Sequence, residues 1–140
     1  MILLGGAGVN DFALLIQTAE QKGAHAVLGD PVADELVSRF GILETDEQDM
    51  LRGIMEKPQP DQTASRLRNI SKYVFMRSFT PYVEHYMNSV RDGEYMLTDV
   101  ISMAVEGGER FTVSAARGRY LDGGSSDGWL EANNVIMSEA

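Results

Sequence analysis

Hydrophobic positions change their spacing along the chain, and the spacing predicts alternating strands and helices. Short apolar runs bounded by Gly or Pro predict strands, whereas apolar positions three and four residues apart predict helices. Strands are predicted at residues 1–4, 25–29, 40–43, 50–58, 69–76 and, as one or two strands, 110–122; helices are predicted at residues 12–22, 33–39, 79–90, 97–106 and 128–140. Turns or loops are predicted at residues 29–31, 44–49 and 58–65. This alternation, without an internal repeat or a linker, predicts one α/β domain over residues 1–140.

End signals support several of the predicted helices. Asn10 or Asp11 can cap the first helix, and Gly23 follows its last residue, as glycine commonly does. Ser78 and Thr98 occupy the corresponding starting positions of two later helices. Residues spaced by three and four predict the face of the first helix that packs on the sheet: Phe12, Leu15, Ile16 and Ala19.

Composition narrows the class of protein. With 44% hydrophobic and 24% charged residues, the chain is typical of a globular domain. Its net charge of −9 argues against a nucleic-acid partner, which requires a basic face. Without cysteine, disulfides and thiolate metal sites are excluded, which fits a cytoplasmic protein. Because no segment approaches a run of about 20 apolar residues, no membrane span is expected.

An acid and a base stand together where a predicted strand meets two prolines. Glu56 and Lys57 precede Pro58 and Pro60. A carboxylate can accept hydrogen bonds from sugar hydroxyls, and a neighbouring ammonium can hold a phosphate. Neighbouring side chains of an extended chain face opposite ways, so binding one ligand requires a bend, which the prolines favour. Taken alone, the pair is a weak signal, and a solvated strand end is the favoured explanation.

A second candidate site lies in the sequence YLDGGSSDGW, residues 120–129. Asp122 ends a predicted strand, and the glycines after it allow a ligand to approach the backbone. One carboxylate at a strand end can ligate Mg²⁺ if a substrate phosphate supplies further oxygens. A tight turn followed by a helix N-cap explains the same residues without a ligand.

In chain order, five segments resemble the C-terminal half of bacterial UTP–glucose-1-phosphate uridylyltransferases, within the sugar-1-phosphate nucleotidyltransferases. They are SRFGIL (38–43), IMEKP (54–58), NISKYVFM (69–76), GEYMLTDVISMAVE (93–106) and ARGRYLDGGSSDGWLEANNVIM (116–137). The resemblance rests on the order of these motifs and covers nearly the whole chain. It implies a Rossmann-like mixed sheet with helices on both faces, without the family's N-terminal nucleotide-binding half.

The resemblance also implies a chemistry, in which glucose 1-phosphate attacks the α-phosphorus of a nucleoside triphosphate and pyrophosphate leaves. Such a reaction needs positioning and charge neutralisation more than covalent catalysis. By motif, Glu56 and the backbone at Gly41 would bind the sugar, with Glu94 a further sugar-side residue. Lys57 would bind the phosphate. Asp122 would ligate Mg²⁺, and Gly124 would lie close to the substrate.

Three departures from the family pattern bear on activity. The Gly-rich nucleotide-binding loop has no counterpart, Gly5-Gly6-Ala7 stands where the family carries a Mg²⁺-binding Asp, and Ser71 stands where it carries Gly. One hypothesis is therefore a sugar-phosphate-binding half that is inactive without its missing N-terminal half. The other is a non-catalytic domain for self-association or ligand sensing. Because the missing half would leave an apolar edge or face uncovered, a homo-oligomer is expected.

Overall fold

The computed structural model describes residues 2–4, 10–89 and 93–139. Its strands are β1 (Ile2–Leu4), β2 (His25–Pro31), β3 (Gly41–Thr45), β4 (Leu51–Glu56), β5 (Leu67–Val74), β6 (Phe111–Ala115) and β7 (Arg119–Leu121). Its helices are α1 (Asp11–Lys22), α2 (Thr80–Ser89), α3 (Leu97–Glu106) and α4 (Ser126–Glu139), with short 3₁₀ helices η1 (Asp34–Arg39) and η2 (Arg77–Phe79). The predicted strand–helix alternation is confirmed.

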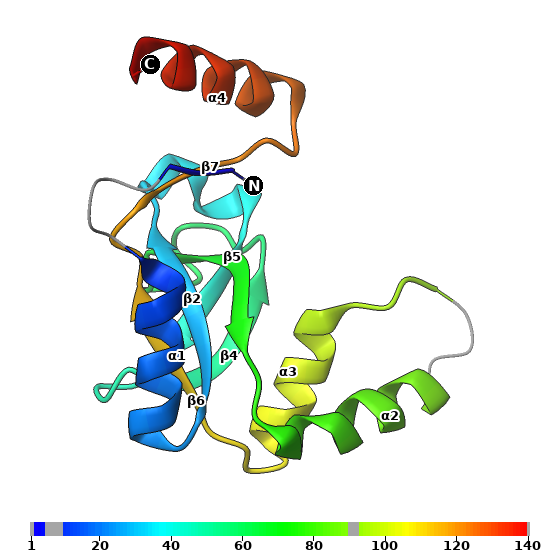
Figure 1. Cartoon of the computed structure of the whole chain (residues 1–140). Coiled ribbons are helices and arrows are strands. Elements are labelled where there is room, and N and C mark those ends of the chain that lie inside the picture. Colours follow the sequence, from blue (N-terminus) through cyan, green and yellow to red (C-terminus); the bar gives the residue numbers. More distant parts are fainter. Residues whose placement is uncertain (1, 5–9, 90–92, 140) are drawn as a thin grey trace.

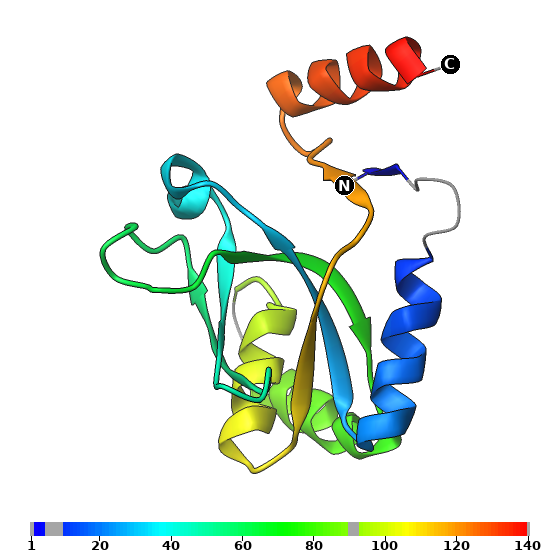
Figure 2. The same ribbon diagram turned by 90° about the vertical axis from the view of Figure 1, so that its left-hand side faces the viewer.

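The main sheet has five strands in the order β4-β3-β5-β2-β6. Strands β2 and β6 run parallel, and the other pairs are antiparallel, so the sheet is mixed, as the resemblance implied. Helix α1 lies on one face, whereas α2 and α3 lie on the other (Figures 1 and 2). Separately, β1 and β7 form an antiparallel pair that matches Ile2 with Leu121.

Strand β2 divides the core between the two faces of the sheet. Its alternating side chains enter different clusters: Ala26 and Leu28 pack with Leu15 of α1, whereas Val27 packs with Ile101 of α3. All of these side chains are fully buried. When both faces of a strand are buried, its sequence is a continuous run of apolar residues. Residues 26–28 show this pattern.

Helix α1 begins and ends where its end signals place it. The Asn10 side chain accepts a hydrogen bond from the Ala13 N–H at 3.0 Å. Gly23 ends the helix in the left-handed conformation, with φ of 54°. Leu15 and Ala19 are buried as predicted, but the same prediction is wrong for two residues of the expected apolar face. Phe12 and Ile16 are 43% and 48% exposed.

The buried stripe of α1 is centred one residue earlier than the apolar spacing predicts. It runs through Asp11, Leu15 and Ala19, which lie four residues apart on one helix face. Phe12 and Ile16 each follow a stripe residue and lie about 100° further around the helix. They therefore form an apolar strip beside the packed face.

Three local predictions are wrong for tertiary reasons. The turn expected at residues 29–31 is strand, because Asp30 and Pro31 pair with Arg68 and Leu67 of β5. Ser78 does not begin α2: it lies in the 3₁₀ helix η2 before it, and its hydroxyl donates to Glu109 at 2.9 Å. Likewise, Thr98 lies inside α3, whose N-cap is Met96. The Tyr86 hydroxyl accepts from the Met96 N–H at 3.3 Å and donates to Asp99 at 2.9 Å, which completes this helix end.

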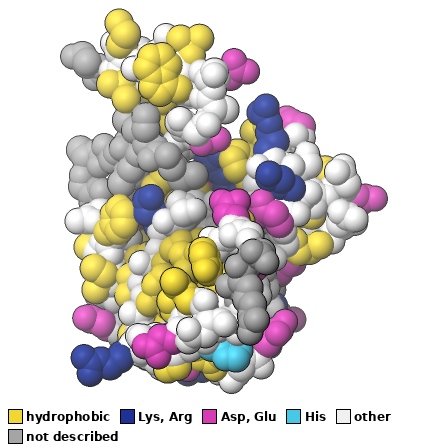
Figure 3. Space-filling model, turned by 90° about the vertical axis from the view of Figure 1, so that its right-hand side faces the viewer, with side chains coloured by type: hydrophobic (Ala, Val, Ile, Leu, Met, Phe, Trp, Pro, Cys, Tyr) yellow, Lys and Arg dark blue, Asp and Glu magenta, His cyan; other side chains and the backbone are white. Residues whose placement is uncertain are grey.

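Helix α4 lies beyond the β1–β7 pair, away from the five-stranded sheet (Figures 1 and 2). Ala132 is the one buried residue among its described side chains. Trp129, Leu130 and Met137 are 59%, 55% and 78% exposed. Figure 3 shows hydrophobic side chains gathered over this helix. Across the described ranges, no helix is both long enough and apolar enough to cross a membrane.

The Asp11 carboxylate fastens α1 to the chain that leads into β7. Although it is only 1% exposed, it accepts hydrogen bonds from the N–H groups of Arg117 and Gly118 and from the Tyr120 hydroxyl, at 2.9–3.2 Å. Burial, together with this carboxylate, raises the pKa of Tyr120, so the phenol stays protonated and donates.

We expect Asp11→Ala to lower the free energy of unfolding by about 2–4 kcal/mol, because it leaves several buried donors without an acceptor. Asp61, which is exposed in the loop before β5, provides the matched control, and Asp61→Ala should change stability by less than about 0.5 kcal/mol. Urea denaturation followed by circular dichroism measures both variants. Equal stability of the two would show that the Asp11 hydrogen bonds do not hold α1 in place.

Candidate functional site

Three of the six predicted site residues, Gly41, Glu56 and Asp122, line two adjoining cavities. The first, the Asp122 cavity, has a volume of about 270 Å³; its lining is Leu36, Arg39, Phe40, Arg68, Tyr120, Leu121, Asp122, Ser125, Asp127, Gly128 and Glu131. The second, the Glu56 cavity, has a volume of about 470 Å³; its lining is Arg39, Phe40, Gly41, Glu56, Asn69, Ser71, Tyr73, Met96, Leu97 and Thr98. Arg39 and Phe40 belong to both linings, so the cavities meet at the end of η1.

In the Glu56 cavity, strand register brings two predicted sugar-binding residues together. Gly41, the first residue of β3, pairs with Glu56, the last residue of β4. A Cβ atom at Gly41 would lie 3.0 Å from the Glu56 carboxylate oxygen Oε2. Glycine at this position therefore leaves room for the carboxylate, which remains exposed at the cavity.

The backbone bends at Lys57, as it must if Glu56 and Lys57 are to bind the same ligand. The φ of Lys57 is 47°, in the left-handed region that residues with a Cβ rarely adopt. The Lys57 N–H donates to the Phe40 carbonyl at 3.1 Å, which holds the bend against the start of β3. The Lys57 side chain is exposed and lies outside the lining of both cavities.

Polar groups that the sequence did not single out also line the Glu56 cavity. The Asn69 Nδ2 donates to the Tyr73 hydroxyl at 2.7 Å, and the Tyr73 hydroxyl lies 3.0 Å from Asn69 Oδ1. Burial raises the pKa of Tyr73, so its hydroxyl is neutral near pH 7. Both residues lie within the motif NISKYVFM (69–76). Their contact could not be predicted from the sequence, because side chains four residues apart on a regular strand do not touch.

A bulge in β5 explains that contact. Between Val27 and Gly29 of β2 the pairing shifts, so that more residues of β5 than of β2 lie in the gap. Ser71 lies in this gap with φ of 56°, and its N–H donates to Asn69 Oδ1 at 3.0 Å. Ser71 therefore occupies a conformation that favours glycine, at the position where the resembling family carries glycine.

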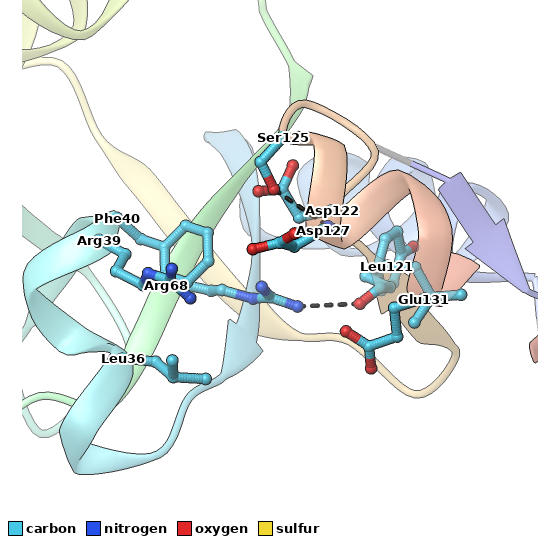
Figure 4. A pocket seen from close by; sticks show the side chains of 11 residues that line it. Leu36, Arg39, Phe40, Arg68, Leu121, Asp122, Ser125, Asp127 and Glu131 are labelled. Carbon is cyan, nitrogen blue, oxygen red and sulfur yellow. Dashed lines mark hydrogen bonds between the residues drawn. The ribbon is translucent and has the colours of Figure 1, made fainter. Parts of the chain in front are cut away.

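In the Asp122 cavity, Asp122 lies opposite η1 (Figure 4). Its Oδ1 accepts from the Gly124 N–H at 3.0 Å, and no hydrogen bond from a described residue reaches Oδ2. Gly128, in the first turn of α4, is packed against the same loop: a Cβ atom there would lie 1.9 Å from the Asp122 carbonyl oxygen. Glycine at position 128 thus lets α4 start directly beside Asp122.

Arg68 forms the floor between the two sides of the Asp122 cavity (Figure 4). Its guanidinium contacts the Asp30 carboxylate at 2.5 and 2.8 Å and donates to the Tyr120 carbonyl at 2.9 Å. The same group lies 4.7 Å from the centre of the Phe40 ring. Its charge is therefore already paired within the protein.

Asp122 fits a Mg²⁺ ion only if the ion is shared with a ligand. Among the described residues, no group of three or more Asp, Glu or His side chains is arranged to hold a metal, although Asp127 and Glu131 line the same cavity. Mg²⁺ is commonly held by one or two carboxylates together with substrate phosphates, and one carboxylate oxygen of Asp122 is available for that role. Residues 5–7, where the family carries its other metal-binding Asp, lie outside the described part of the chain.

The remaining predicted residues lie at the margins of these cavities. Gly124 is exposed and is in contact with Asp122 through its N–H. Glu94 is also exposed; it precedes Met96, which lines the Glu56 cavity, but does not itself line either cavity. The structure therefore brings Gly41 with Glu56 and Asp122 with Gly124, and connects the two pairs through Arg39 and Phe40.

The five-stranded mixed sheet with helices on both faces defines an α/β protein with a Rossmann-like fold. The chain belongs to the nucleotidyl transferase family, whose family model matches residues 1–139. The UTP–glucose-1-phosphate uridylyltransferase of Haemophilus influenzae is 31% identical over 131 residues, which are 87% of this chain and 43% of that protein. The enzyme of the same name from Escherichia coli is 26% identical over 132 residues.

Solved structures agree with the sequence matches. A UTP-bound UGPase from Acinetobacter baumannii has a TM-score of 0.84 at 25% identity; the match covers 99% of this chain and 48% of that one. A UDP-glucose pyrophosphorylase complexed with UDP-glucose has a TM-score of 0.81 at 19% identity, which supports the fold. The chain thus spans about half the length of these relatives, and its resemblance to the uridylyltransferases is confirmed.

Ser71 provides a test of the bulge geometry. A residue with a Cβ in the left-handed region costs about 1–2 kcal/mol, and glycine avoids that cost but loses about 0.5–1 kcal/mol in backbone entropy. We therefore expect Ser71→Gly to raise the free energy of unfolding by up to about 1 kcal/mol and Ser71→Val, which is β-branched, to lower it by at least as much. Urea denaturation measures both. A Val variant as stable as the parent would show that the bulge does not require a positive φ.

Proposed function

We propose that this chain is the sugar-phosphate-binding part of a nucleotidyltransferase similar to UTP–glucose-1-phosphate uridylyltransferase, and that it is inactive alone. One observation carries the proposal: the β3–β4 register places Gly41 and Glu56 in one cavity, which meets the Asp122 cavity at Arg39 and Phe40. A sugar phosphate requires groups that bind hydroxyls beside groups that bind charge, and the two adjoining cavities provide both. The single-domain assignment over residues 1–140 is part of the same proposal.

In this proposal, Glu56 accepts hydrogen bonds from sugar hydroxyls, and the backbone at Gly41 lies against the sugar ring. Tyr73 and Asn69 add neutral donors and acceptors, while Glu94 approaches from the margin. Lys57 supplies a cation for the phosphate. A phosphate oxygen then attacks the α-phosphorus of UTP, the bond to the β-phosphate breaks, and pyrophosphate leaves.

Residues around the second cavity would handle the charge of that reaction. Asp122 would hold Mg²⁺ together with ligand phosphates, and the bound ion supplies charge neutralisation. Gly124 leaves its backbone close to the substrate and orients Asp122 through its N–H. The nucleotide would be bound by a second half of the fold, because the sequence offers no counterpart to the family's Gly-rich loop.

We expect Lys57→Ala to weaken binding of glucose 1-phosphate about ten- to a hundredfold and to leave binding of free glucose nearly unchanged. A charge-assisted hydrogen bond of about 1.5–3 kcal/mol gives this range. Glu56→Gln should weaken binding of both ligands, because its partners are sugar hydroxyls. Titration calorimetry at low salt measures the affinities.

Lys22→Ala is the matched control for these variants. Lys22 is exposed like Lys57, but it lies at the end of α1, whereas Lys57 directly follows Glu56 and is bonded to Phe40. The Lys22→Ala variant should bind like the parent. Equal weakening of glucose and glucose 1-phosphate by Lys57→Ala would contradict the phosphate role of Lys57. A parent chain that binds no sugar phosphate at millimolar concentration would contradict the proposed function.

We also expect the isolated chain to release no pyrophosphate from UTP and glucose 1-phosphate with Mg²⁺. Removing one preorganised contact to a developing charge can slow a reaction by about a hundredfold or more, and here the whole triphosphate-binding loop is lacking. A coupled pyrophosphate assay checks this, with protein from a host that lacks its own uridylyltransferase. Turnover that follows the purified chain would overturn the assignment of inactivity.

A second candidate function, self-association without catalysis, is favoured by exposed apolar side chains on two helices. Phe12 and Ile16 form a strip on α1, and Trp129, Leu130 and Met137 are exposed on α4. Such surfaces are commonly covered by another protein segment. Light scattering distinguishes a monomer from a homo-oligomer, and an oligomer without sugar-phosphate affinity would favour this second function.

A further inference from the structure

Arg39 is the one cation whose side chain lies at the junction of the two cavities without an ion-pair partner among the described residues. It is the last residue of η1, it is exposed, and it lines both cavities. By contrast, the nearby Arg66 and Arg68 are paired, with Asp34 and Asp30 respectively. An unpaired guanidinium is a group that a ligand can use without breaking an existing contact.

The backbone on either side of Arg39 is held in place. Val37, two residues earlier, is fully buried, and its carbonyl accepts the Phe40 N–H at 3.3 Å. Phe40, one residue later, has its ring 4.7 Å from the Arg68 guanidinium and its carbonyl bonded to the Lys57 N–H. Only the Arg39 side chain must therefore be ordered when a ligand binds, which limits the entropic cost.

The distribution of charge favours an anion at the junction over one deep in the Asp122 cavity. In the Glu56 cavity, Arg39 and Glu56 are the charged lining residues. In the Asp122 cavity, the carboxylates of Asp122, Asp127 and Glu131 face Arg39 and Arg68 (Figure 4), and Asp30 already pairs with Arg68. A phosphate deep in the Asp122 cavity would meet mainly carboxylates, whereas one at the junction would meet Arg39.

We propose that Arg39 binds the phosphate group of the sugar 1-phosphate at the junction of the Glu56 and Asp122 cavities. This inference rests on the proposed function and adds a residue that the motif comparison does not assign. With the sugar against Gly41 and Glu56, the phosphate at the end of the sugar ring reaches Arg39. A guanidinium donates two parallel hydrogen bonds to a phosphate, which an ammonium does not.

Lys57 and Arg39 act together in this arrangement. The Lys57 N–H donates to the carbonyl of Phe40, so the Lys57 backbone lies next to the residue that follows Arg39. Arg39 fixes the orientation of the phosphate through its planar fork, and Lys57 adds a point charge. The phosphate is then held between the sugar and the Asp122 carboxylate, where a shared Mg²⁺ would lie.

The test is titration calorimetry of the 140-residue chain with glucose 1-phosphate, inorganic phosphate and glucose. Arg39→Gln, which keeps the length but removes the charge, should weaken glucose 1-phosphate binding about tenfold or more. Phosphate binding should weaken similarly, and glucose affinity should change less than about twofold. Arg39→Lys should recover part of the loss. Arg77→Gln is the control, because Arg77 is an exposed arginine of η2 outside both cavities and should bind like the parent.

The other outcomes would reject either the role of Arg39 alone or the proposed function as well. If Arg39→Gln binds glucose 1-phosphate like the parent, the Arg39 inference is wrong and the proposed function stands. If Arg39→Gln loses glucose and glucose 1-phosphate equally while its thermal unfolding is unchanged, Arg39 serves the sugar and not the phosphate, which also overturns the inference. If the parent binds no sugar phosphate, both the inference and the proposed function are wrong.

Discussion

The arrangement of the Asp122 cavity depends on the contacts of the Arg68 guanidinium. This group joins parts of the chain that are far apart in sequence: the Asp30 carboxylate of β2, the Phe40 ring before β3 and the Tyr120 carbonyl of β7. Arg68 and Asp30 are only 12% and 14% exposed. Losing one partner of such a buried pair costs about 3–5 kcal/mol, because the other charge remains buried without compensation. The same group thus fixes the five-stranded sheet to β7 and sets the distance between the two sides of the Asp122 cavity.

Much of the fold follows from local sequence signals, and the deviations follow from contacts that those signals do not contain. Asn10 and Gly23 place the ends of α1 because capping depends on a few adjacent residues. The buried face of α1 is different, since the helical spacing defines a stripe but not its centre. That centre is set by the Asp11 carboxylate, whose partners lie more than a hundred residues later. In the same way, residues 29–31 contain turn-forming types, yet Asp30 is kept in the strand by Arg68.

The residues of the candidate site also fall into two groups, those that the sequence predicts and those that only the tertiary structure identifies. Glu56 and Asp122 were found from short motifs, and the structure adds that Glu56 shares a cavity with Gly41 through strand register. The sequence did not predict a role for Arg39. Its place at the junction depends on how η1 packs beside the other segments that line the two cavities. Ser71 carried a partial signal: the family glycine pointed to a special backbone, but only the bulge in β5 shows that a positive φ is the reason.

The two cavities differ in how firmly they are built, and this difference follows from which elements form them. Half of the residues that line the Glu56 cavity lie on the paired strands β3, β4 and β5, so that side of the cavity is held by the sheet. The Asp122 cavity has α4 as one wall, and among the described side chains of that helix only Ala132 is buried. Gly128 holds the first turn of α4 close to Asp122, but the outer face, with Trp129 and Leu130, has no packing partner in the described chain. Any segment that covers this face also fixes the wall of the Asp122 cavity. Covering α4 and binding a charged ligand beside Asp122 are therefore energetically linked, because each stabilises the same position of the helix.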